Sequence, residues 1–242
     1  MNKKILILPL LLLIGLTSNA QEDHEDYNSE FVWGINKNTS GGLIGGFTFR
    51  KSRKIGDNLF ESVGLEVMNV KHNQETQLRT SAGSSFIFGK VNYLYALRFQ
   101  YGRELILFRK APQQGVEIKA ITAIGPSLGI LAPYYIEYSP DRGSTIGGNT
   151  ERVPYDPSIH SIEGIIGTGY LFQGIQESNI RIGANLKAGI SFEMGTLKSS
   201  VTGVEIGALL DAYTQKIDLM AGVENKAIFP TAYITIFYGT RR

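Results

Sequence analysis

The sequence contains no cysteine and only three histidines. The lack of cysteine excludes a disulfide framework and any metal site built on thiolates. After residue 20 no apolar run approaches the roughly 20 residues that a membrane-spanning helix needs. The sequence also lacks an excess of one sign of charge. Setting aside two lysines near the start leaves 22 basic and 22 acidic residues. A neutral chain gives no reason to expect nucleic acid as a partner.

The start of the chain carries the one long apolar stretch. Two lysines precede residues 5–16, which are almost entirely Leu and Ile, and the small residues Ser18 and Ala20 follow. This order is typical of a cleaved signal peptide, so residues 1–20 are predicted to be removed. Residues 21–29 are acidic and are predicted to form a periplasmic leader. One histidine among flexible carboxylates fixes no coordination geometry, so no metal site is expected there.

What the chain does have is alternation. In residues 180–193, seven apolar residues alternate with seven polar or glycyl ones without interruption. A strand has a period of two residues, so one of its faces is apolar and the other is polar. Fourteen residues are more than a typical globular strand needs and are enough for a tilted strand to cross a bilayer. The segment therefore indicates a transmembrane strand with lipid on one side and a polar lumen on the other.

Seven further segments show a similar pattern. The eight predicted strands are Glu30–Lys37, Leu43–Arg50, Leu59–Lys71, Ser84–Arg103, a strand from Gly115 to Pro126 or on to Leu131, Ile180–Glu193, Ser200–Tyr213 and Thr231–Gly239. These strands predict an all-β fold, an antiparallel up-and-down transmembrane β-barrel over residues 30–242. Because the number of strands is even, both termini are predicted to lie on the same side of the membrane, in the periplasm. Residues 132–179 are rich in proline and glycine and are predicted to form a long extracellular loop. The barrel has ten strands instead if Ile130–Tyr138 and His160–Tyr170 add a hairpin.

Ten charged residues are predicted to face the lumen, five acidic and five basic. An eight-stranded barrel has an interior just wide enough for its own side chains, so these charges would have to pair with one another. Such a balanced interior favours a plugged barrel over a narrow channel, since a selective pore usually shows an excess of one sign. The predicted interior charges are Glu66, Lys90, Arg98, Glu117, Lys119, Arg181, Lys187, Glu193, Glu205 and Asp211.

The outer face of the fourth predicted strand is aromatic. Tyr93, Tyr95, Phe99 and Tyr101 recur at every second or fourth position. They are interpreted either as an aromatic girdle in contact with outer-membrane lipids or as a contact with another barrel. Together with loop 132–179, they are the surfaces through which other outer-membrane or periplasmic proteins would bind.

Signals of catalysis are weak. Ser158, His160 and Glu163 lie close together in the long loop, which offers the residue types of an acyl-transfer site of the lipid A deacylase kind. Polar loops are rich in these residues in any case, so a non-enzymatic protein is predicted. No cofactor is expected, since the glycine-rich stretch 164–169 is not followed by the Lys-Ser/Thr of a nucleotide loop.

From Phe31 to Arg242 the chain resembles the outer-membrane β-barrel proteins of Bacteroidota that are grouped as PorT-like. The residues that carry the resemblance are Gly183–Glu193, Ser200–Gly207 and the aromatic last strand Tyr233–Tyr238. The pair Arg241 and Arg242 departs from the pattern of an aromatic final residue. The resemblance implies a non-enzymatic subunit of a large outer-membrane machine for protein secretion, gliding or barrel assembly.

Overall fold

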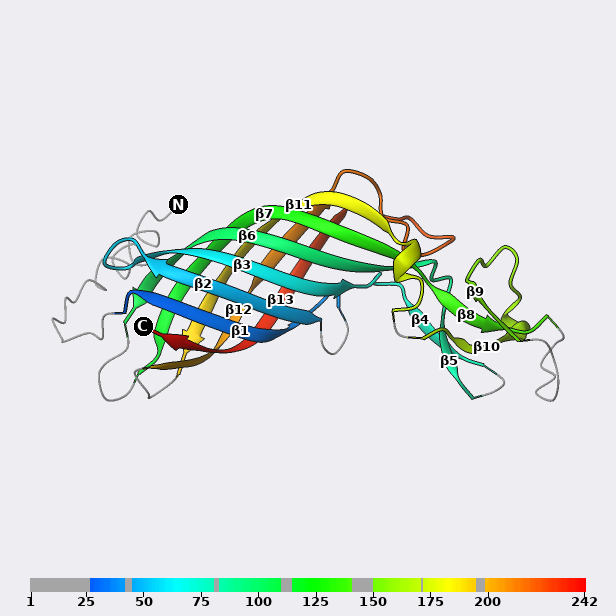
Figure 1. The fold of residues 1–242 in the computed structure, drawn as a ribbon, viewed down its shortest axis with the longest axis horizontal. Helices are drawn as coiled ribbons and strands as arrows, with labels where there is room; N and C mark the ends of the chain where they lie inside the picture. The colour runs from blue at the N-terminus through cyan, green and yellow to red at the C-terminus, as the bar shows by residue number, and fades with distance from the viewer. Residues whose placement is uncertain are drawn as a thin grey trace, which may run out of the picture.

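The computed structural model describes residues 27–41, 45–80, 83–109, 115–140, 150–170, 172–194 and 199–242. Eight long strands form one closed antiparallel barrel (Figure 1). Each pairs with its neighbours along the chain, and the first pairs with the last, so the predicted up-and-down barrel is confirmed. Its strands are β1 (Ser29–Asn38), β2 (Gly46–Lys54), β3 (Leu59–Val70), β6 (Asn92–Phe108), β7 (Glu117–Pro133), β11 (Asn179–Glu193), β12 (Ser200–Tyr213) and β13 (Ile228–Arg241).

The remaining elements form a lobe beyond one end of the barrel (Figure 1). Strands β4 (Thr76–Arg79) and β5 (Ser85–Phe88) make a hairpin, and β8 (Tyr135–Tyr138), β9 (Glu151–Pro154) and β10 (Ile165–Thr168) make a three-stranded sheet. Two short 3-10 helices, η1 (Ile162–Gly164) and η2 (Ile175–Glu177), lie in the same region. No helix among the described residues is long and apolar enough to span a membrane.

The lobe corrects two expectations. The predicted strand 84–103 is two elements, because its first part is β5 of the lobe hairpin and the barrel strand β6 begins only at Asn92. The hairpin considered for a ten-stranded barrel does exist, since β8 and β10 pair antiparallel, but it belongs to the lobe sheet. The described part of loop 132–179 therefore contains ordered strands and short helices rather than only irregular chain. Both corrections have one cause: alternation shows that a segment is a strand but not which sheet it joins.

The outer wall of the barrel is apolar and exposed, as the alternation requires. In β1 the outward residues Phe31, Trp33 and Ile35 are exposed while the residues between them are buried. The opening segment β11 keeps the same rule, with Ile182 exposed and Asn185 buried. A closed barrel satisfies its backbone hydrogen bonds between strands, and an apolar belt around it suits hydrocarbon rather than water. The chain is thus a membrane-spanning β-barrel.

Pro126 is tolerated within β7 because the side chain of Asn185 supplies hydrogen bonds where the backbone pairing is interrupted. Pro126 has no N–H, and the pairing of β6 with β7 is interrupted beside it, between the Arg98–Ser127 and Tyr101–Ile124 pairs. The amide nitrogen of Asn185 on β11 lies 3.0 Å from the carbonyl oxygen of Gly125 and 3.4 Å from that of Phe99. The strand therefore continues to Pro133, two residues past Leu131, which is the longer of the two predicted ends.

The ends of the barrel differ. The described termini lie at one end, where the connections between β2 and β3, β6 and β7, and β11 and β12 are short (Figure 1). The four other connections, including the whole lobe, lie at the opposite end, as predicted for the loops after the odd-numbered strands. The predicted signal peptide, residues 1–20, and leader residues 21–26 lie outside the described residues.

Candidate functional site

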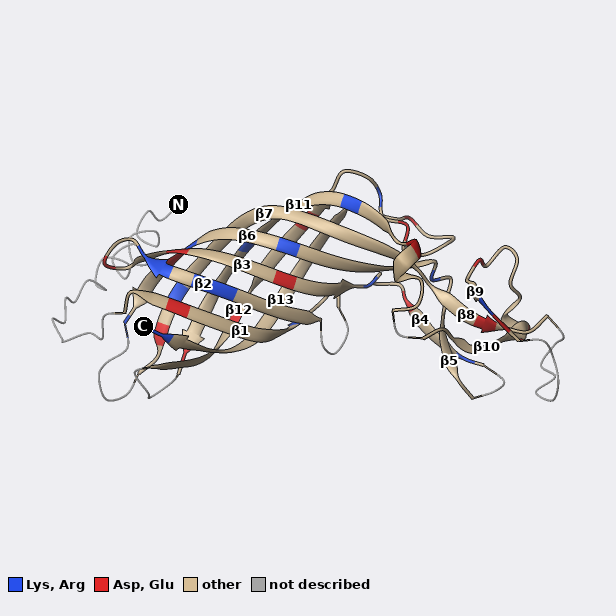
Figure 2. Ribbon diagram, in the orientation of Figure 1, with Lys and Arg blue, Asp and Glu red and all other residues tan. Residues whose placement is uncertain are grey.

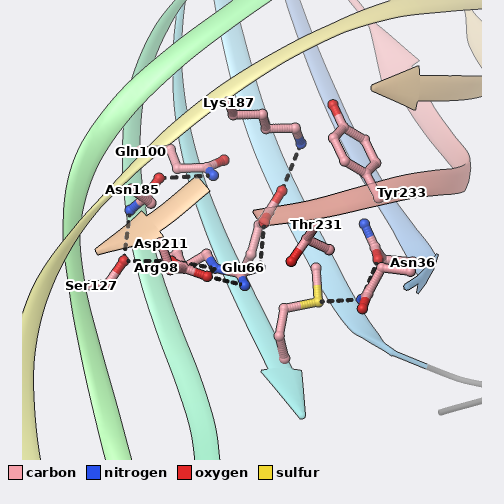
Figure 3. A network of polar contacts seen from close by, with 12 residues as sticks. Asn36, Glu66, Arg98, Gln100, Ser127, Asn185, Lys187, Asp211, Thr231 and Tyr233 are labelled. Carbon is pink, nitrogen blue, oxygen red and sulfur yellow. Dashed lines mark hydrogen bonds and ion pairs between the residues drawn. The ribbon is translucent and has the colours of Figure 1, made fainter. Parts of the chain in front are cut away.

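The lumen contains two clusters of ion pairs, with acidic and basic residues interspersed along the barrel strands (Figure 2). The central cluster joins opposite walls. Arg98 of β6 binds Asp211 of β12 at 2.5 Å and Glu66 of β3 at 3.3 Å, and all three side chains are buried. Lys187 of β11 contacts Glu66 at 2.6 Å and Glu205 of β12 at 2.9 Å. Figure 3 shows Lys187, Glu66, Arg98 and Asp211 pointing toward one another inside the barrel.

The central cluster continues through Arg50 of β2. Its guanidinium reaches Glu205 at 2.6 Å and Glu104 of β6 at 2.9 Å. Neutral groups complete the network, since Tyr233 donates to Glu205 at 2.7 Å and Ser127 donates to Asp211 at 3.0 Å. Buried charges persist only when they are paired and hydrogen-bonded, and here nearly every lumen charge meets a partner from another strand.

The terminal cluster lies at the end of the barrel that holds the chain termini. Lys119 of β7 binds Glu30 of β1 at 3.0 Å, and Arg241 of β13 binds Glu30 and Glu117, each at 2.9 Å. Arg241 also pairs with Glu193 of β11. These contacts cross the barrel from β1 to β7, so the lumen is occupied by side chains at this level too.

Tyr27 covers the terminal cluster. Its position differs from the prediction that residues 21–29 form a leader outside the barrel. Its ring stacks on Phe60 at 4.9 Å, and its hydroxyl donates to Glu117 at 3.0 Å. Burial raises the pKa of the Tyr27 hydroxyl above its ordinary value, an effect that Lys119 partly opposes. Part of residues 21–29 is therefore inserted into the barrel end rather than free in solvent.

An apolar cap closes the other end of the lumen. Inward residues of β3, β6, β7, β12 and β13 pack there against the connection between β12 and β13, and all are buried. The connection between β12 and β13 is fixed in place because Val91 donates its amide to the carbonyl of Leu219 at 2.8 Å. The cap consists of Met68, Val70, Leu94, Ala96, Leu131, Tyr213, Ile217, Leu219, Met220 and Phe229.

Eight of the ten predicted interior charges lie in these two clusters. Lys90 is a correction: it precedes β6, lies fully buried above the lumen and binds Glu75 at 2.6 Å. Arg181 is on the inward register of β11 but is only half-buried, and its Nε has no hydrogen-bond partner among the described residues. The sequence reading missed Glu30, Arg50, Glu104 and Arg241.

The missed charges had a detectable signal. All four occupy inward positions of barrel strands. Glu30 and Arg50 stand at the ends of predicted strands, where the alternation already places them on the inward face. Glu104 and Arg241 lie beyond the predicted limits, and the correct limits of β6 and β13 include them. With them, the clusters contain seven carboxylates and five basic side chains among the described residues, rather than equal numbers.

No family model and no curated protein matches the chain. Similar solved structures include two of Ail, the attachment invasion locus protein of Yersinia pestis, one of them in complex with the heparin analogue sucrose octasulfate. They are 9% and 6% identical over 90% of this chain and 100% of theirs, with TM-scores of 0.37 and 0.40. Neisserial surface protein A is 10% identical over 91% of this chain and 100% of its own, with a TM-score of 0.39.

The lobe has a conventional core. Phe86, Tyr134, Ile136, Tyr155 and Ile165 are buried together, so the β4–β5 hairpin and the three-stranded sheet share one apolar interior. The hydroxyl of Tyr134 accepts a hydrogen bond from the backbone amide of Ile87 at 3.0 Å. Burial raises the pKa of the Tyr134 hydroxyl to about 12. The lobe is therefore a small folded unit carried by the barrel.

The four aromatic residues of β6 divide into two pairs. Phe99 and Tyr101 are exposed on the outer wall, as a lipid-facing girdle requires. Tyr93 and Tyr95 are half-buried under the lobe, where Tyr93 meets Tyr134 in an edge-to-face contact at 5.4 Å. The aromatic residues expected to form one surface thus have two environments: one pair lies on the outer wall of the barrel and the other pair packs against the lobe.

The structure places His160 at the surface of the lobe. Its Nδ1 accepts the backbone amide of Asp156 at 3.1 Å, while the hydroxyl of Ser158 donates to Asp156 at 2.6 Å. The hydrogen bond from Ser158 lowers the pKa of the exposed Asp156 carboxyl. Ser158 is thus hydrogen-bonded to Asp156 and not to His160, which is the geometry of a local turn. The described residues contain no group of acidic or histidine side chains arranged to hold a metal ion.

Proposed function

We propose that the protein is a plugged outer-membrane β-barrel that acts as a non-enzymatic accessory subunit of a larger membrane complex. Bacterial outer membranes are where barrels with an even number of strands reside, and in them the short turns and the termini face the periplasm. In this orientation the lobe projects outside the cell. The resemblance to PorT-like proteins of Bacteroidota suggests a machine for protein secretion, gliding or barrel assembly.

The closed lumen supports a role other than transport. Side chains from opposite walls meet at two levels, and the apolar cap lies above them. A conducting path would have to break several buried ion pairs at once, which is costly. We therefore expect wild-type protein in planar bilayers to show no steady conductance, and a stable open channel would contradict the plugged barrel.

The observation that carries the subunit proposal is the folded lobe and its distal patch, defined as Ile159 and Ile162. Both side chains are exposed, Ile159 by 72%. Helix η1, which starts at Ile162, lies at the end of the lobe away from the barrel (Figure 1). His160, next to Ile159 in the chain, contacts Tyr138 at the end of β8, so the patch is held clear of the membrane. Contiguous exposed apolar surface is typical of a binding site for another protein, and we propose that the two isoleucines form part of one.

Mild detergent extraction tests this proposal. The tagged wild-type protein is expected to recover partner proteins in fixed stoichiometry, and Ile159→Asp combined with Ile162→Asp is expected to lose them. Thr168→Asp is the matched control, because it adds a charge to an exposed residue of the lobe outside the distal patch. Recovery of a lone wild-type monomer, or equal recovery with all variants, would contradict docking through the distal patch.

A further inference from the structure

One part of the lobe lies against the barrel rim. This rim segment consists of Tyr170 and Phe172–Glu177 and connects β10 to β11. Gly174 is packed so closely against the end of β7 that an added Cβ would lie 2.9 Å from the Pro133 ring. Glu177 accepts a hydrogen bond from the hydroxyl of Tyr135 at 2.7 Å. The segment is thus packed against the stretch from Pro133 to Tyr135, where β7 leads into β8.

Large apolar side chains of this fixed segment are nevertheless exposed. Tyr170 is 68% exposed, Phe172 54% and Ile175 42%. The lobe core lies nearby, but none of the three belongs to it. These side chains therefore form an ordered, exposed apolar surface. Such a surface suits a partner that is also apolar.

The backbone at Phe172 is held in an unfavourable conformation. Its φ of 61° is the only positive value for a non-glycine residue among the described parts of the chain. A left-handed backbone strains a residue with a Cβ, and such strain persists where the surroundings enforce it. The ring lies 5.6 Å from that of Tyr95 on β6. The strained turn thus places the ring against an outward-facing residue of the barrel wall.

The apolar surface of the rim segment continues directly into the membrane-facing wall. The segment leads into β11, whose first outward residues Ile180 and Ile182 are 65% and 61% exposed. On its other flank, the guanidinium of Arg152 lies 4.1 Å from the centre of the Tyr170 ring. Aromatic rings with a cationic neighbour are typical of the boundary between hydrocarbon and lipid headgroups.

We propose that the rim segment is a lipid anchor that inserts Tyr170, Phe172 and Ile175 into the interface of the bilayer leaflet on the loop side. The occupant is lipid because this surface is continuous with a wall that already faces lipid. Insertion covers the exposed apolar side chains and fixes the tilt of the lobe over the membrane. This inference rests on the membrane-spanning barrel and is independent of the partner proposed for the distal patch.

The absence of cysteine makes a direct test possible, because any introduced thiol is the only one. Phe172→Cys and Ile175→Cys are labelled with an environment-sensitive fluorophore, and Ser158→Cys in the distal loop is the control. The full chain is reconstituted in phosphatidylcholine vesicles whose acyl chains carry bromine close to the headgroup. Labels on the rim segment are expected to show a blue shift and several-fold stronger quenching by brominated lipid than the control, whereas iodide in the water should quench the control more.

Two results would overturn the anchor. Equal quenching by lipid at all three positions would show that the rim segment faces water. Protection from both quenchers, together with cross-linking of a second copy through the same cysteine, would show that the surface binds protein instead. Folding of each variant is verified by the heat-dependent mobility of the barrel on gels, and the two rim positions serve as replicates if one variant fails to fold.

Discussion

The barrel and the lobe bury opposite kinds of residue. Inside the barrel the buried side chains include Arg98, Glu66 and Asp211, while its exposed wall is apolar. Inside the lobe the buried side chains are aromatic and aliphatic, while charged residues such as Arg152 are exposed. Both regions consist of strands with two unlike faces. The difference shows that the surrounding solvent and the closure of the sheet decide which face is buried.

The largest expected effect tests the polar core of the barrel. Arg98→Met leaves Asp211 buried without its basic partner, and loss of one member of a buried pair costs about 3–5 kcal/mol. We expect the free energy of unfolding to fall by this amount in urea titrations of vesicle-bound protein, followed through the single tryptophan, Trp33.

The control for Arg98 is on the same strand. Arg103→Met replaces an outward-facing, exposed arginine of β6, for which a change of about 0–1 kcal/mol is expected. If both variants lose the same stability, the lumen network is not what holds the barrel together.

The second prediction concerns the apolar core of the lobe. Ile136 of β8 is fully buried in the lobe core together with Phe86 of β5, so Ile136→Ala should cost about 2–5 kcal/mol of local stability. Limited proteolysis should cut the lobe faster, while the urea transition of the barrel stays in place. Ile159→Ala, at an exposed position of the lobe, should leave the cleavage rate unchanged. A shift of the barrel transition with Ile136→Ala would show that the two regions unfold as one.

A smaller effect is expected where the lobe meets the rim. Gly174 has a φ of 82°, and a residue with a Cβ in the left-handed region costs about 1–2 kcal/mol. Gly174→Ala should therefore increase cleavage of the lobe moderately. Gly167→Ala is the matched control, since the nearest atom to its added Cβ is 3.6 Å away and its φ is not positive. Equal cleavage of the two variants would argue against a strained attachment at the rim.

The smallest effect is expected for ion pairs on the outer wall. Arg53 lies three residues from Arg50 on β2, but its side chain is exposed and pairs with Glu61. Arg53→Gln should change the stability of the barrel by about 0–1 kcal/mol, because exposed pairs are screened and mobile. The same substitution at Arg50 should produce a loss comparable to that of Arg98→Met. Urea titration of the two variants compares inward and outward charge within one strand, and similar losses would contradict the assigned faces.

Much of the barrel could be predicted from alternation. Residues 180–193 agree with β11 within one residue, and the period of two in the predicted strand Glu30–Lys37 puts Phe31, Trp33 and Ile35 on one face, which the structure exposes. The arrangement of short turns and long loops at opposite ends also follows from the strand count. These features are local or periodic, so they are written along the chain.

The lumen site was predicted less completely. Lys90 follows the alternation of the strand that comes after it, yet it lies above the lumen because the chain leaves the lobe hairpin at that point. Glu30 and Arg241 lie at strand ends, where sequence patterns are least informative. Their pairing depends on register, which brings together residues 211 positions apart.

The sequence by itself determined that this chain forms long two-faced strands, and hence a barrel with an apolar wall and a polar interior. Only the tertiary structure decided which charges meet, that Tyr27 and the β12–β13 connection close the two ends of the lumen, and that the long loop folds into a lobe with its own core. The physical reason is that the face of a strand depends on its own period of two. Pairing, closure and the assignment of a strand to one sheet or another depend on contacts between residues that are far apart in the chain.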